Sequence, residues 1–277
     1  MNKHEKLTVN ELIVSEESGA ETIEQGWEKS RQNKVIKGLL DGENLQAIVE
    51  SMPGFKESFC DLDTIDCSDG RVLDGHKIGI AGSGLLLSEQ ERAVFVERFK
   101  GKIKALTAHA DCGAAAKKFN SLKSEEIPEG ISNSDEYGAY CAKKLAEQLG
   151  ADYKFLSREE MASEYHNEVA IVLDQSGKFD STNLDDFPAH FVCSGAGLGF
   201  SKDYMKAELE TLTGIALGHH GFGAERFTDE NPFYIIVSAD NSSELIHWEE
   251  VAKEAVSQFG DKIIVKGFVR PDSAENN

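Results

Sequence analysis

The sequence lacks a long apolar run and an excess of basic residues. No stretch of the 277-residue chain approaches the roughly 20 apolar residues that a membrane-spanning helix needs. Lysine and arginine together number 29 against 49 aspartates and glutamates, so the formal net charge is −20. Nucleic acids are bound through clustered lysine and arginine. We therefore expect neither a membrane nor a nucleic acid as a partner.

Cysteine is scarce, and its spacing is not that of a small disulfide-bonded secreted domain. The chain has 5 cysteines: Cys60, Cys67, Cys112, Cys141 and Cys193. The first residues also lack the apolar core of a signal peptide. We therefore expect a cytoplasmic protein, in which cysteines serve as buried apolar residues, metal ligands or nucleophiles rather than in disulfides. Cys141 and Cys193 have apolar neighbours and are expected to be structural.

The pattern that is present is that of an α/β protein. Residues 1–54 are polar and acidic and are expected to form an N-terminal arm, partly disordered and then helical. Short apolar runs and amphipathic segments then alternate, which predicts parallel sheets covered by helices. Strands are expected at 64–67, 77–81, 104–108, 168–174, 189–195, 212–218 and 262–268, and helices at 88–99, 132–150 and 242–260.

The two halves of this region resemble each other. CAKKLAEQLG (141–150) resembles VAKEAVSQFG (251–260), and AHADCGAA (108–115) resembles GHHGFGAE (218–225). We therefore predict an internal duplication, with a first unit at residues 55–160 and a second unit at residues 161–277. The alternative is two unrelated βαβ units that look alike because all such units do.

Two thiols and an imidazole are predicted to meet in the first unit. Cys67 and His109 each end a predicted strand, and Cys112 opens a predicted helix. Because the carboxyl ends of neighbouring parallel strands form one crevice, these three side chains can converge. Two thiolates and an imidazole suit zinc, and three protein ligands leave a fourth position open. A thiol hydrolase with Cys67 as nucleophile and His109 as base is less favoured, because Cys112 lies so close to the histidine.

These motifs, Cys67-Ser68-Asp69-Gly70-Arg71 and His109-Ala110-Asp111-Cys112-Gly113, resemble those of the β-class carbonic anhydrases. The resemblance departs at Gly70, where the family usually has serine. It implies one zinc per first unit, held by Cys67, His109 and Cys112, that hydrates CO2 to bicarbonate through zinc-bound hydroxide. It also implies catalytic roles for Asp69, which would orient the hydroxide, and for Arg71, which would hold the charge of Asp69.

The resemblance leaves other functions open. The same scaffold could hydrolyse carbonyl sulfide or carbon disulfide, or the chain could be a non-catalytic zinc protein. The small-molecule substrate is CO2 or bicarbonate in the first case. The resemblance also implies that two of these two-unit chains could associate as a homodimer of pseudo-dimers.

The second unit is predicted to have lost the metal site. Asp174 and Phe222 stand where the first unit has Cys67 and Cys112. We therefore expect one zinc per chain, with the second unit as a built-in partner that contributes wall residues such as Phe200 or Phe222. The role of His219 and His220 stays open. Surface or packing positions are expected for the remaining histidines considered: His76, His166, His190 and His247.

Overall fold

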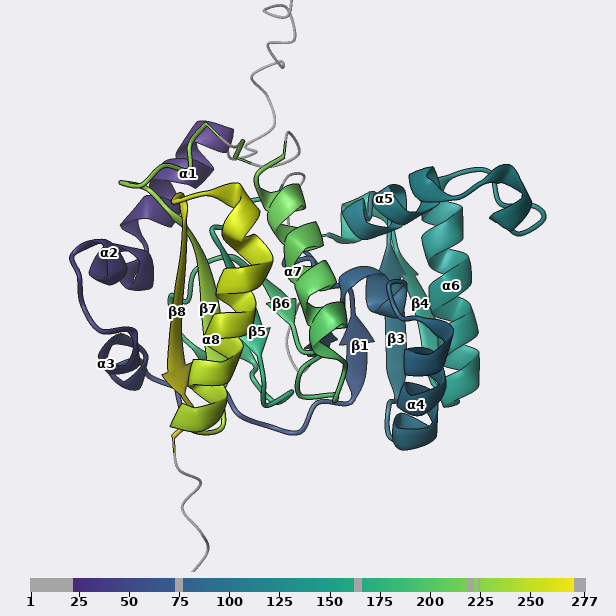
Figure 1. The fold of residues 1–277 in the computed structure, drawn as a ribbon, viewed down its shortest axis with the longest axis horizontal. Helices are drawn as coiled ribbons and strands as arrows, with labels where there is room; N and C mark the ends of the chain where they lie inside the picture. Colours follow the sequence, from purple (N-terminus) through teal and green to yellow (C-terminus); the bar gives the residue numbers. More distant parts are fainter. Residues whose placement is uncertain (1–21, 73–76, 162–165, 219–221, 224, 272–277) are drawn as a thin grey trace, which may run out of the picture.

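The computed structural model describes residues 22–72, 77–161, 166–218, 222–223 and 225–271. The chain forms an α/β protein with two four-stranded sheets, and every strand pair within them is parallel (Figure 1). The strand order is β2-β1-β3-β4 in the first sheet and β6-β5-β7-β8 in the second. The predicted α/β class with parallel sheets is therefore confirmed.

The first sheet is built from short strands between capped helices. Ser88 caps the helix after β2 through a reciprocal capping box with Glu91, and Gly150 ends the last helix of the unit in a left-handed conformation with φ 72°. α6 packs on β3 and β4. The elements are β1 (Thr64–Asp66), β2 (Lys77–Gly79), the 3-10 turn η2 (Ala81–Gly84), α4 (Glu89–Phe99), β3 (Ala105–His109), α5 (Gly113–Ser121), η3 (Ser124–Glu126), α6 (Ser134–Leu149), β4 (Asp152–Leu156) and η4 (Arg158–Glu160).

The second sheet has longer and more deeply buried central strands. Every residue of β5 and β7 is buried, as expected for parallel strands covered on both faces. α7 packs on β5 and β6, and α8 packs on β7 and β8. The elements are β5 (Ala170–Asp174), η5 (Ser181–Asn183), β6 (His190–Cys193), α7 (Lys202–Ala216), β7 (Phe233–Ala239), α8 (Ser242–Val256), η6 (Ser257–Phe259) and β8 (Ile263–Val269).

The two sheets lie side by side (Figure 1), and β2 of the first unit contacts β6 of the second. The Ser194 amide donates to the Gly79 carbonyl oxygen at 2.8 Å, and the Val192 amide donates to the Ser68 carbonyl oxygen at 2.9 Å. A Cβ on Gly79 would lie 2.5 Å from the Val192 carbonyl oxygen, so only glycine permits this approach. The junction therefore runs beside the segment that follows β1.

The described part of the N-terminal arm packs on the second unit. It comprises α1 (Ile23–Gln32), α2 (Lys34–Leu40) and α3 (Leu45–Glu50), and α3 contacts β8. The Gln46 side chain accepts from the Val269 amide at 2.7 Å and donates to its carbonyl oxygen at 3.0 Å. Trp27 makes edge contacts with Phe222 and Phe227. The helical arm is thus confirmed, while the predicted disordered stretch lies outside the described residues.

One predicted strand is wrong. Residues 212–216 of the predicted strand 212–218 form the last turn and a half of α7, which begins after the N-cap Ser201. The buried positions Tyr204, Glu208 and Leu212 recur at helical spacing along one face of this helix. Read alone, the apolar run has the same appearance in a strand and in a buried helix.

This correction also changes how the two units correspond. β7 occupies in the second sheet the place that β3 occupies in the first, and it ends at Ala239. The sequence likeness pairs His109 with His219. His109 ends β3, whereas His219 precedes β7 in the chain and lies outside the described residues, so the two histidines do not hold equivalent positions relative to these strands. Gly150 and Gly260 do correspond, because each closes a helical segment before the last strand of its sheet.

Among the described residues, we find no helix with the length and apolar composition of a membrane-spanning segment.

Candidate metal centre

The structure brings Cys67, His109 and Cys112 together, as the sequence predicts. Cys67 directly follows β1, His109 is the last residue of the neighbouring strand β3, and Cys112 is the N-cap of α5. Their ligand atoms all lie within 4.8 Å of one another, and all three residues are buried. The carboxyl ends of two adjacent parallel strands therefore form the site.

The hydrogen bond of His109 fixes which ring nitrogen faces the thiols. His109 Nδ1 lies 2.8 Å from the Ala110 carbonyl oxygen. Because a carbonyl only accepts, Nδ1 carries a proton, and Nε2 is the nitrogen left to bind a metal once it has lost its own proton. Within the described chain, His109 Nε2 is buried without a hydrogen-bond partner. A histidine that gives one N–H to a backbone carbonyl and keeps the other nitrogen bare is typical of a metal ligand.

The two thiols have the separation that a zinc site requires. Cys67 Sγ and Cys112 Sγ lie 3.8 Å apart. Two thiolates bound at about 2.3 Å to a tetrahedral zinc ion lie about 3.8 Å apart. The donor set of two sulfurs and one imidazole nitrogen also suits zinc. These residues therefore fit a zinc ion, with Cys67, His109 and Cys112 as the residues that would hold it.

The charges of the three groups influence one another. A hydrogen bond from Cys112 holds the pKa of Cys67 well below its usual range despite burial, with a contribution from the charge of His109. Burial alone would lower the pKa of His109, but the Cys67 thiolate raises it to about 9. A thiolate and an imidazolium thus neutralise each other where a cation would bind, so metal binding would release protons.

A tight turn after β2 donates a backbone hydrogen bond to Cys67. The Gly82 amide donates to Cys67 Sγ at 3.2 Å. Gly82, Ser83 and Gly84 all have positive φ angles, of 58°, 53° and 91°, so the chain turns in a left-handed conformation at this point. This turn, η2, aims a backbone N–H at the sulfur.

Asp69 and Arg71 form the predicted pair. Arg71 Nη2 lies 2.6 Å from Asp69 Oδ2, and Arg71 Nε lies 3.0 Å from Asp69 Oδ1. Burial would raise the pKa of Asp69, but the Arg71 hydrogen bonds and the charges of His166 and His109 lower it to about 2. Asp69 Oδ2 lies 3.8 Å from His109 Nε2, yet Asp69 does not belong to the group formed by the two thiols and the imidazole. The carboxylate is therefore ionised beside the site and held by Arg71 rather than placed among the ligands.

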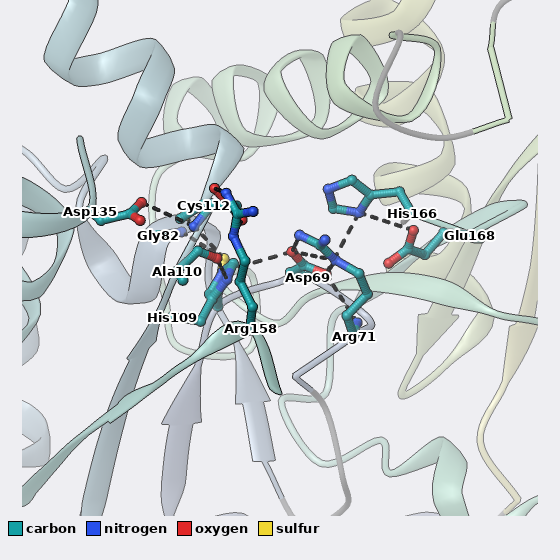
Figure 2. Close-up of polar contacts among 12 residues, drawn as sticks. Asp69, Arg71, Gly82, His109, Ala110, Cys112, Asp135, Arg158, His166 and Glu168 are labelled. Carbon is teal, nitrogen blue, oxygen red and sulfur yellow. Dashed lines mark hydrogen bonds and ion pairs between the residues drawn. The ribbon is translucent and has the colours of Figure 1, made fainter. Parts of the chain in front are cut away.

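Two residues at this site were missed by the sequence analysis. His166, expected at the surface or in packing, is buried and lies 3.7 Å from Asp69 through Nδ1, and 3.2 Å from Glu168 through the same atom. Figure 2 shows Asp69 between His109 on one side and His166 with Glu168 on the other. Both residues belong to the second unit, so no local motif of the first unit could have revealed them.

Asp69, His166 and Glu168 also lie close enough to hold a cation. The Arg71 guanidinium already neutralises Asp69 with paired hydrogen bonds and lies near Glu168. A second cation would have to compete with this built-in positive charge. We therefore interpret the second cluster as a buried ion-pair network.

A cavity of about 520 Å³ opens next to the site. The first unit contributes Arg71 and Gly113 to its lining, and the second unit contributes His166, Gly214 and Ile215. The second unit thus does form part of the wall, but not through the predicted phenylalanines. Phe200 packs against Phe95 and Tyr204, whereas Phe222 packs against Trp27. Neither phenylalanine lines this cavity.

The described part of the second unit has no comparable metal centre of its own. Asp174, at the end of β5, accepts hydrogen bonds from Ser176 and from the Phe179 amide in a local turn. His219 and His220 lie outside the described residues. Cys193 is fully buried as expected, whereas Cys141 is half-buried beside Tyr137.

Comparisons of the chain with protein-family models, with curated proteins and with solved structures find no match.

Proposed function

We propose that this protein is a zinc-dependent carbonic anhydrase that interconverts CO2 and bicarbonate. The observation that carries the proposal is the buried group of Cys67, His109 and Cys112 at the ends of β1 and β3, with Asp69 beside it. The proposal includes the identity of the metal as zinc, the reaction with CO2 and the relationship to the β-class carbonic anhydrases. A site of two sulfurs and one nitrogen leaves one tetrahedral position for solvent, which is typical of catalytic rather than structural zinc.

When bound, zinc would lower the pKa of water from 15.7 to about 7 and so supply a nucleophile near neutral pH. The chain's own residues do the remaining work. Asp69 accepts a hydrogen bond from the reacting solvent molecule and directs its lone pair toward CO2. Arg71 keeps Asp69 ionised and prevents its rotation, because it holds both carboxylate oxygens.

The second unit acts in this proposal as a built-in partner of the first. The two sheets share one strand order and meet at β2 and β6, which supports a duplicated unit fused as a pseudo-dimer. His166, Gly214 and Ile215 of the second unit close one side of the cavity beside Arg71. CO2 would reach the site through this cavity, and bicarbonate would leave by it near the positive charge of Arg71.

Stopped-flow measurement of CO2 hydration tests the proposal. The zinc-loaded wild-type protein should accelerate hydration, and Cys67→Ser should reduce the rate by at least about 100-fold because it removes a metal ligand. Cys141→Ser is the matched control, since this half-buried free cysteine lies in α6 and not in the cavity lining. It should keep the wild-type rate.

Inactivity of a fully zinc-loaded wild-type protein would contradict the proposal. Sulfide release from carbonyl sulfide, measured with the same variants, then distinguishes a hydrolase on this scaffold from a non-catalytic zinc protein.

A further inference from the structure

A buried carboxyl group of the second unit lies behind the candidate metal centre. Glu208 is on α7 and has no exposed surface. Its Oε1 accepts a hydrogen bond from the Ala81 amide at 2.5 Å and from the Ser68 hydroxyl at 3.2 Å. Both partners belong to the first unit, so this one oxygen joins two segments that are otherwise 13 residues apart in the chain, at 68 and 81.

Each of these two segments carries one part of the Cys67 environment. Ser68 is the residue after Cys67. Ala81 begins η2 and precedes Gly82, whose amide donates to Cys67 Sγ. The position of the Gly82 amide depends on a left-handed turn, a conformation that non-glycine residues such as Ser83 adopt only when the surroundings hold them there.

We propose that Glu208 is a positioning residue for the metal centre: from the second unit it holds Ser68 and Ala81, and so sets Cys67 and its Gly82 hydrogen bond in the geometry that binds metal. This inference rests on the metal site proposed above. It also gives the second unit a role beyond lining the cavity.

The location of Glu208 is difficult to explain by packing alone. A buried carboxyl is costly unless its oxygens find donors, and a leucine would fill this helix position at lower cost. Glu208 Oε2 receives no hydrogen bond from a nitrogen or oxygen donor among the described residues, and the Cys193 thiol beside the carboxyl group is a weak donor, so the carboxyl group is poorly compensated. A residue that lowers stability in this way is expected where its contacts serve the site.

The test compares metal affinity in three variants, by competition of Zn²⁺ with a chelator. Glu208→Leu removes the acceptor and should raise the dissociation constant for Zn²⁺ by about 10- to 100-fold, as for other residues that orient metal ligands. Glu208→Gln keeps a carbonyl oxygen of the same reach and should stay within about threefold of the wild type. Leu209→Ala, at the next fully buried position of α7, should lower thermal stability without changing metal affinity.

A spectroscopic measurement separates positioning from a general loss of structure. In the Co²⁺-substituted protein, a hydrogen bond to a thiolate stabilises the sulfur electrons and raises the energy of the sulfur-to-cobalt charge-transfer band. Glu208→Leu should shift this band to longer wavelength, because the Gly82 hydrogen bond weakens, while Leu209→Ala should leave it in place. If Glu208→Leu does not fold, Ser68→Ala removes one of the two contacts and should give a smaller change in the same direction.

The outcomes distinguish this inference from the proposed function. Equal Zn²⁺ affinity and equal Co²⁺ spectra in the wild type and in Glu208→Leu would overturn the role of Glu208 while leaving the metal centre intact. A wild-type protein that binds neither metal would overturn both.

Discussion

At the scale of single residues, Asp69 makes the contacts that link the metal centre to its surroundings. Its carboxylate is bonded to Arg71 by both oxygens and lies within 4 Å of His109 and of His166. It is therefore positioned to act on a molecule at the site without belonging to the ligand group. This separates two roles that can be measured independently, metal binding and turnover.

Asp69→Asn should separate them. The variant removes the charge and replaces one acceptor oxygen with a donating NH2 group, while leaving the two thiols and the imidazole in place, so zinc content should stay at the wild-type level. The rate of CO2 hydration should fall by about 10- to 100-fold. The control is Asp63→Asn, because Asp63 directly precedes the first residue of β1, at the end of the strand away from the site. Its zinc content and hydration rate should equal those of the wild type.

Loss of zinc from Asp69→Asn would show instead that Asp69 is needed for metal binding and not only for turnover, and an unchanged rate would remove it from the mechanism.

The residues that sequence could predict are those with a local pattern. Cys67, Asp69 and Arg71 alternate after one strand, and His109 and Cys112 end another, so their convergence follows from the geometry of parallel strands. His166, Glu168 and Glu208 come from the other unit. Nothing near them in the sequence marks a site, because their role depends on how the two sheets meet.

At the scale of elements, the loop between Asp69 and Arg71 is closely packed against the second unit. A Cβ on Gly70 would lie 2.4 Å from the His190 carbonyl oxygen and 2.9 Å from Glu168 Oε1. This close approach explains why the chain has glycine at this position, since a serine side chain would not fit. The glycine thus reflects the close packing at the junction between the units.

Gly70→Ala should therefore lower the free energy of unfolding by about 1–3 kcal/mol, the usual cost of forcing an extra carbon into a packed site. Gly214→Ala is the matched control, because Gly214 lies within α7 and a Cβ at this position would have no atom within 4 Å. It should be neutral or stabilise by up to about 1 kcal/mol, since alanine favours helix. Urea unfolding monitored by circular dichroism measures both, and a Gly70→Ala protein as stable as the wild type would contradict the close packing.

Elements with strong end signals were predicted well, and those without were not. The capping box at Ser88 and the left-handed Gly150 mark α4 and α6 in the sequence as they do in the structure. β4 and β7 were not predicted. β4 has only one buried residue, Leu156, and so has little apolar pattern. β7 is a largely apolar, fully buried run of the same kind as β5, which was predicted, so β7 was overlooked despite a readable signal.

At the scale of the whole molecule, the second unit completes the first. It supplies His166, Glu168 and Glu208 around the centre and part of the cavity wall. Alternating strands and helices predicted the parallel sheets, and the polar, acidic composition of residues 1–54 predicted the helical arm. The meeting of β2 with β6 could not be predicted, because it depends on backbone contacts between segments over 100 residues apart, such as Gly79 and Ser194.

We propose that one zinc ion per chain is held by Cys67, His109 and Cys112. Elemental analysis of the purified protein, combined with native mass spectrometry, measures it directly. The wild type should contain one zinc per chain, Cys67→Ser should lose it, and a variant with both His219 and His220 replaced by alanine should keep it. A zinc content of zero or two in the wild type, or a zinc that persists in Cys67→Ser, would contradict the claim.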